Sequence, residues 1–90
     1  MRDAGTASQS LPTAVEYRSR RVLDQAVGVL VLALRLSPNT AEQLLSVVAR
    51  RHLLTAERLG AAVLAAASSE HLDDPLARKV AWQEWGDLLV

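Results

Sequence analysis

Residues 21–31 read RVLDQAVGVLV and lie within the longest part of the chain with a clear helical pattern. Their valines belong to a seven-residue spacing that runs through Val15, Val22, Val29 and Leu36. Apolar residues at every seventh position, with small residues beside them, are typical of one face of a long helix. The spacing predicts a helix of about 22 residues. No alternation of apolar and polar residues favours a strand anywhere in the chain.

Three further signals predict where helices begin. Thr13 with Glu16 fits a capping box at the start of the long helix, because hydroxyl and carboxylate can each accept from a backbone N–H. Ser37-Pro38 predicts the start of a second helix, with serine as N-cap and proline at the first helical position. Thr55 is the predicted N-cap of a third helix.

A helical periodicity also predicts which residues face inward. They are Ala41, Leu44, Leu45, Val48, Ala49 and His52 in the second helix; Leu59, Ala62, Val63 and Ala66 in the third; and Val80 or Ala81, Trp85, Leu88 and Leu89 in a fourth helix that begins at Asp73-Asp74-Pro75. Trp82 and Trp85 are expected to complete a core or a dimer interface. His52 continues an apolar stripe, so it is expected to be partly buried or to cap its helix.

This pattern of small and apolar residues resembles that of a known family. Ala26 and Gly28 in the first helix, Ala41 in the second, and Leu59 with Val63 in the third have the spacing of the ANTAR domain. That domain is a small three-helix RNA-binding module of bacterial transcription-antitermination regulators. The resemblance covers residues 21–66 and implies an all-α fold, in which a long first helix and an ANTAR-like three-helix unit are followed by a C-terminal fourth helix. We expect a disordered leader over residues 1–12, the ANTAR-like domain over 13–69 and the last helix over 70–90.

The resemblance implies a stand-alone regulator that binds RNA hairpin loops as a dimer and so prevents a terminator from forming. Because the family's usual sensory domain is missing here, a signal would come from a partner protein in trans. Several polar positions differ from the family pattern: Val27 stands where Lys is usual, Ala33 and Ser46 where Arg is common, Glu42 in place of an apolar or aromatic residue, and Leu53 where Asn is common. These differences favour an alternative, a helical dimerisation or protein-interaction module that has lost RNA binding.

Arginines supply the candidate RNA contacts. All but one of the ten Lys and Arg residues are Arg, whose guanidinium can pair bidentately with phosphate. Since the formal net charge is +0, nucleic-acid binding would depend on local clusters of these residues. The candidates are Arg50, Arg51 and Arg58 near the junction of the second and third helices, Arg20 and Arg21 in the first helix, and the small residues Ala26 and Gly28, beside which an RNA backbone can pass.

The first helix is predicted to form a homodimer. Its apolar residues cover more than one face, and such a helix needs partners on both sides. The expected interface consists of Val15, Val22, Val29, Leu30 and Leu36. Gly28 lies inside this helix, where glycine costs about 1 kcal/mol relative to alanine. Glycine at this position would be explained by the close approach of the second or third helix, by the close approach of a second copy of the first helix, or by access for RNA.

No catalytic, metal or cofactor site is predicted, and we do not expect an enzyme. His52 and His71 lack the companions of a zinc-binding helix, there is no glycine-rich phosphate loop, and the chain has no Cys for thiolate chemistry. The longest apolar run, residues 27–34, is far shorter than the roughly 20 residues that span a bilayer. Residues 1–9 do not resemble a signal peptide. We therefore expect a cytoplasmic protein without a membrane segment.

Overall fold

The computed structural model describes residues 13–89, and within them the protein is all-helical. The helices are α2 (Ala14–Leu34), α3 (Pro38–Arg51), α4 (Ala56–Ser68) and α5 (Pro75–Leu89). The predicted all-α fold with a long first helix and a fourth helix at the C-terminus is confirmed, and α2 has 21 residues. The predicted leader over residues 1–12 lies outside the described residues.

The first three helices begin at the N-caps that the sequence predicts. The hydroxyl of Thr13 accepts from the backbone N–H of Glu16 at 3.1 Å, and the carboxylate of Glu16 accepts from the N–H of Thr13 at 2.9 Å. At the start of α3 the hydroxyl of Ser37 accepts from the backbone N–H of Thr40 at 3.2 Å. At the start of α4 the hydroxyl of Thr55 accepts from the backbone N–H of Arg58 at 3.1 Å. Each cap joins groups within one turn of helix, so local sequence is enough to place these ends.

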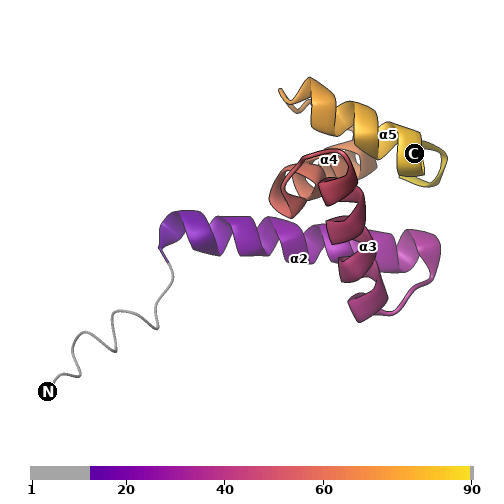
Figure 1. Cartoon of the computed structure of the whole chain (residues 1–90), viewed down its shortest axis with the longest axis horizontal. Helices are drawn as coiled ribbons and strands as arrows, with labels where there is room; N and C mark the ends of the chain where they lie inside the picture. Colours follow the sequence, from indigo (N-terminus) through magenta and orange to yellow (C-terminus); the bar gives the residue numbers. More distant parts are fainter. Residues whose placement is uncertain (1–12, 90) are drawn as a thin grey trace, which may run out of the picture.

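Helix α4 lies at the centre of the fold and contacts the other three helices (Figure 1). Helix α3 turns away from α2 with a bend of 107° between the two helices. The largest fully buried side chains come from all four helices and are Leu30, Leu45, Val48, Leu59, Val63 and Val80. In the described part of the chain, no single helix is long and apolar enough to cross a membrane.

Helices α2 and α4 approach closely at Gly60. A Cβ at this position would lie only 3.2 Å from the Cβ of Ala26, so glycine allows the two helices to meet. Such an approach within the chain was one of the explanations offered for Gly28, and the structure excludes it. Gly28 is exposed, and beyond its own turn of helix nothing lies within 4 Å of the place a Cβ would take. Residues two apart on a helix point about 200° apart, so Ala26 faces α4 while Gly28 faces away.

The N-terminal part of α2 extends beyond the other helices (Figure 1). Residues 13–18 are all exposed, and Val15 is 68% exposed. Val22, Val29 and Leu36, which continue its seven-residue spacing, are half-buried at the edge of the core. The seven-residue spacing therefore marks the flank of α2.

Helix α5 packs on α4 through Val80, Ala81, Trp85 and Leu89, all of which are buried. The predicted burial of Trp85 is confirmed, since this side chain is 5% exposed. Leu88 is 53% exposed, so the expectation that it faces inward was wrong. The expectation for Trp82 is met only in part, because this side chain is 48% exposed and its ring lies over Gly86, where a Cβ would collide with it.

Substitution of Gly60 by Val tests the contact between α2 and α4. The added branched side chain has no room beside Ala26 and Leu45, so we expect the free energy of unfolding to fall by about 1–3 kcal/mol. Ala67→Val is the matched control, since Ala67 is exposed on the same helix and should cost only a few tenths of a kcal/mol. Urea denaturation measures the free energy of unfolding of both variants. Equal losses for the two variants would contradict the packing described here.

The two tryptophans of α5 provide a second matched pair. Trp85→Ala should lower the free energy of unfolding by about 3–5 kcal/mol, because it removes a large buried side chain and leaves a cavity. Trp82→Ala should cost much less, since Trp82 is 48% exposed. Thermal unfolding followed by circular dichroism is the measurement. A larger effect at Trp82 than at Trp85 would show that α5 is packed through its other face.

Candidate functional site

Arg58 lies in the first turn of α4, but it does not join a free arginine cluster. Its Nε–H donates to Oδ2 of Asp74 at 2.9 Å and its Nη2–H donates to Oδ1 at 2.8 Å, which makes a bidentate ion pair. The hydrogen bond from Arg58 lowers the pKa of Asp74 below its usual value and raises that of Arg58. Arg58 stays a predicted RNA contact, but its guanidinium already has a carboxylate partner.

The same carboxylate begins the last helix. Oδ1 of Asp74 accepts from the backbone N–H of Ala77 at 3.3 Å, and the backbone oxygen of Asp74 accepts from Arg78 N–H at 3.0 Å. Asp74 is the N-cap of α5, as the sequence predicts for the segment before Pro75. One side chain thus caps α5 and ties its start to the start of α4.

Arg50 and Arg51 are both exposed in the last turn of α3. His52 follows them as the C-cap, and its backbone N–H donates to the carbonyls of Val48 at 3.2 Å and Ala49 at 3.1 Å. The expectation that His52 is partly buried or caps its helix is confirmed. Two positive charges at a helix C-terminus interact favourably with the helix dipole, and both guanidinium groups remain accessible to a ligand.

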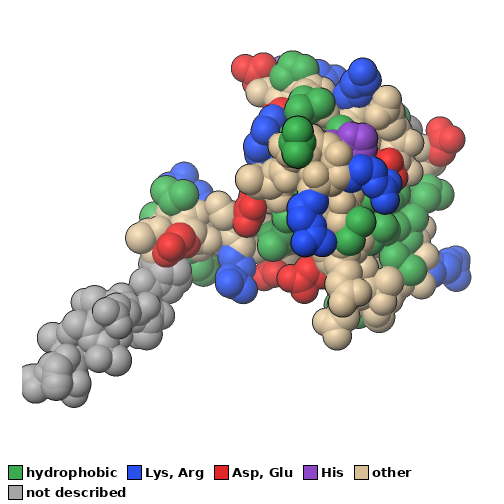
Figure 2. Space-filling model, in the orientation of Figure 1, with side chains coloured by type: hydrophobic (Ala, Val, Ile, Leu, Met, Phe, Trp, Pro, Cys, Tyr) green, Lys and Arg blue, Asp and Glu red, His purple; other side chains and the backbone are tan. Residues whose placement is uncertain are grey.

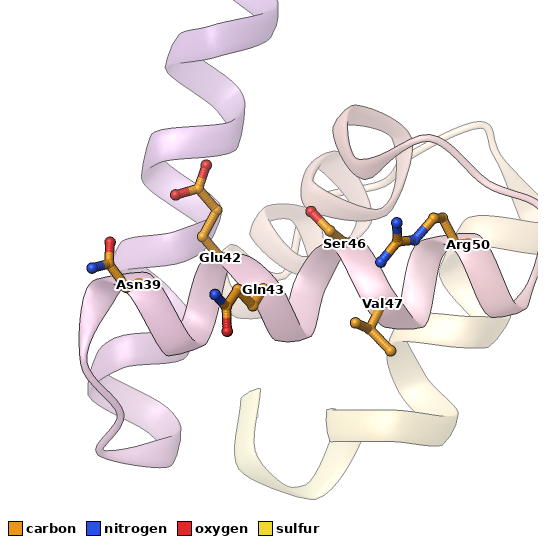
Figure 3. Close-up of a pocket in the computed structure, with 6 residues that line it drawn as sticks. All are labelled: Asn39, Glu42, Gln43, Ser46, Val47 and Arg50. Atoms are coloured by element: carbon orange, nitrogen blue, oxygen red, sulfur yellow. The ribbon is translucent and has the colours of Figure 1, made fainter.

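An exposed face of α3 leads to Arg50. Its side chains surround a shallow hollow of about 540 Å³, and Figure 3 shows that all of them come from this helix: Asn39, Glu42, Gln43, Ser46, Val47 and Arg50. Asn39, Gln43, Ser46 and Arg50 form one row along the helix, which we call the α3 stripe. Amide and hydroxyl groups can both donate and accept hydrogen bonds at base edges, and a guanidinium donates to base acceptors and to phosphate oxygens. Sequence reasoning missed the stripe, although its spacing of four, three and four residues marks one helix face.

The other predicted RNA contacts lie on different surfaces. Arg20 and Arg21 are exposed on α2, but neither lines the hollow at Arg50. Arg18 borders a second hollow of about 290 Å³ between α2 and α4, with the Arg58–Asp74 pair at its edge. In Figure 2, basic side chains lie on the face where α3 is in front, and acidic side chains lie on the same face. The arginines therefore do not converge on one anion site in the described structure.

Burial contradicts two further predictions about α2. Ala26 is 0% exposed, so RNA cannot reach it, whereas Gly28 is exposed and open. Leu30 is also 0% exposed because it belongs to the core of its own chain, so it is not available for a dimer interface. In both cases the side chain points from α2 toward the buried side of the molecule.

Leu53 adopts a left-handed backbone with φ 59° and is 90% exposed. Asparagine tolerates this conformation better than leucine does. Among the described residues, no group of three or more His, Asp or Glu side chains is placed to hold a metal ion.

Comparison of the chain with protein-family models, with curated proteins and with solved structures found no match.

Asp74→Asn removes the ion pair with Arg58 but keeps the N-cap of α5, because asparagine is an equally good N-cap. Asp74 has a lowered pKa in the folded protein, so its contribution is present above the unfolded value of about 3.9 and is lost as the pH falls through the folded value. We expect a lower melting temperature for the variant at pH 7 and a smaller difference below pH ~4. Asp73→Asn is the control. A variant as stable as the unmodified protein at pH 7 would show that the pair contributes nothing.

Proposed function

We propose that this protein is an RNA-binding transcription antitermination regulator, similar to the ANTAR domain, that acts as a dimer on RNA hairpin loops. The observation that carries the proposal is the α3 stripe, which ends at the exposed guanidinium group of Arg50. Arg51, the next residue, is also exposed. The resemblance over residues 21–66 and the all-helical fold support it. A signal would come from a partner protein in trans, and the proposal requires no cofactor and no catalytic step.

The chemistry of the α3 stripe suits exposed nucleotides. Proteins usually read RNA sequence in loops and bulges, where base edges are free to accept hydrogen bonds. The amides of Asn39 and Gln43 can pair with such edges, while Arg50 and Arg51 bind the phosphate backbone. Because the net charge is +0, long-range attraction adds little, and affinity depends on these local contacts. We therefore expect weak binding with a steep dependence on salt.

An RNA with two hairpin loops, titrated over a range of salt concentrations, tests the proposal. The double variant Arg50→Ala, Arg51→Ala should bind ~10-fold or more weakly at low salt, if each lost charge-assisted contact is worth ~1 kcal/mol or above. The slope of log K against log salt concentration should fall by about 1.4, since two phosphate contacts to a single strand are lost. Gln43→Ala should weaken binding to one loop sequence without a change in slope, because its amide carries no charge.

The matched control is Arg78→Ala with Lys79→Ala, which removes the same charge from an exposed part of α5. If this control weakens binding as much as the α3 variant does, the attraction is general and the α3 stripe is not the site. Absence of binding by the folded, unmodified protein at low ionic strength would overturn the proposal.

A second candidate function is a helical dimerisation or protein-interaction module that has lost RNA binding. It is favoured by the engagement of Arg58 with Asp74 and by the exposure of two leucines, Leu32 at 82% and Leu53 at 90%. The titration distinguishes the two functions, since only the first requires saturable binding to looped RNA.

A further inference from the structure

The outward face of α2 carries two features that the fold of the single chain does not use. Gly28 is exposed, and beyond its own turn of helix nothing lies within 4 Å of the place its Cβ would take. Leu32, one turn further on, is 82% exposed. Both lie opposite the buried residues Ala26 and Leu30 of the same helix. Glycine weakens a helix interior and an exposed leucine gains nothing from burial, so neither residue stabilises the single chain.

We propose that this face of α2 binds a second copy of the chain in antiparallel orientation, with Leu32 of each copy seated on Gly28 of the other. The inference specifies the surface of the dimer that the proposed function expects, and it does not depend on RNA binding. It also replaces the dimer interface expected from the sequence, which included the buried Leu30.

The shape of the face is complementary to itself. Leu32 is a projecting side chain and Gly28 leaves a gap, and i, i+4 residues lie on the same side of a helix. When two such helices run antiparallel and Leu32 of one lies over Gly28 of the other, the two-fold relation creates the same contact a second time. Val29 and Val31 lie on either side of the row formed by Gly28 and Leu32, and their half-buried side chains would lose further contact with water in this arrangement.

The charges on the face select the antiparallel orientation. Asp24 lies one turn before Gly28 and Arg21 two turns before it, while Arg35 follows the last residue of α2. The charge nearest the segment around Gly28 and Leu32 is therefore a carboxylate at one end and a guanidinium at the other. Both are exposed, and neither forms an ion pair with another described residue. Antiparallel pairing brings Asp24 of each copy next to Arg35 of the other, whereas parallel pairing in register brings like charges together.

Sedimentation velocity of the full chain over a range of concentrations tests the surface. We expect a dimer whose dissociation constant rises roughly tenfold or more in Leu32→Ser, because a central buried contact is removed. Leu88→Ser is the matched control, since Leu88 is an exposed leucine on α5 and its loss should leave the dimer unchanged. Gly28→Leu should also weaken the dimer, while its monomer keeps its helical circular dichroism because the new side chain projects into open space.

Charge reversal tests the orientation. Asp24→Arg and Arg35→Asp should each weaken the dimer, and a chain that carries both changes should recover the affinity, because each ion pair between copies is restored with its polarity exchanged. A parallel dimer would give no such recovery, since like charges would still face each other.

Three results would overturn the inference: an unmodified protein that stays monomeric up to millimolar concentration, a dimer that tolerates Leu32→Ser as well as Leu88→Ser, or a double reversal no better than its single parents. The RNA titration with Arg50→Ala and Arg51→Ala is scored separately. If Leu32→Ser weakens the dimer but the unmodified protein binds no RNA, the proposed function alone is refuted. If the protein binds RNA and its dimer is unaffected by Leu32→Ser, this inference alone is refuted.

Discussion

The contact between Gly60 of α4 and Ala26 of α2 determines how closely the helices of this protein pack. With a hydrogen atom on one side and a methyl group on the other, the helices come near enough that even one added Cβ would lie at 3.2 Å. This approach allows Leu30, Leu59 and Val63 to fill the space between the helices, where all three are fully buried. Since α3 and α5 each contact both α2 and α4, neither could keep both of its contacts if α2 and α4 lay further apart.

Close approach matters because the chain has few large side chains. It has no Phe, and its core consists mainly of Ala, Val and Leu, which gain dispersion energy only at short distance. Helix α5 supplies Trp85, the large buried aromatic of the described core, and the Arg58–Asp74 pair joins the starts of α4 and α5. Because that pair lies near the surface, its main effect is to position α5 rather than to add much stability.

The two outward surfaces in our proposals lie on different helices and use different chemistry. The α3 stripe is polar and ends at Arg50, whereas the outward face of α2 exposes Gly28 and Leu32 between Asp24 and Arg35. Dimerisation through α2 would give one particle two α3 stripes. Two weak sites that are linked in this way can hold an RNA with two loops more tightly than either site alone, without any new contact. A protein with a net charge of +0 would benefit from such linkage, since its overall charge attracts RNA little.

How much could be predicted depended on the distance in sequence between the interacting groups. The caps at Thr13, Ser37 and Thr55 involve partners within one turn, so sequence alone determined where these helices begin. Helical periodicity likewise identified most inward positions of α3 and α4. It did not separate Leu88 from Leu89, because adjacent residues at the edge of an apolar face differ by about 100° and the neighbouring helix decides between them.

Only the tertiary structure decided which groups far apart in sequence meet. Arg58 binds Asp74 sixteen residues away, and Gly60 rather than Gly28 is the glycine at a helix contact. Glycine and arginine have the same local properties at a contact and on a free surface, so the sequence could name them as candidates but could not assign their partners. Their roles follow from the rotation of each helix about its own axis. That rotation is set by the core residues that the helices bury together, among them Ala26, Leu30, Leu45, Leu59 and Val80. The sequence of a single helix therefore does not determine it.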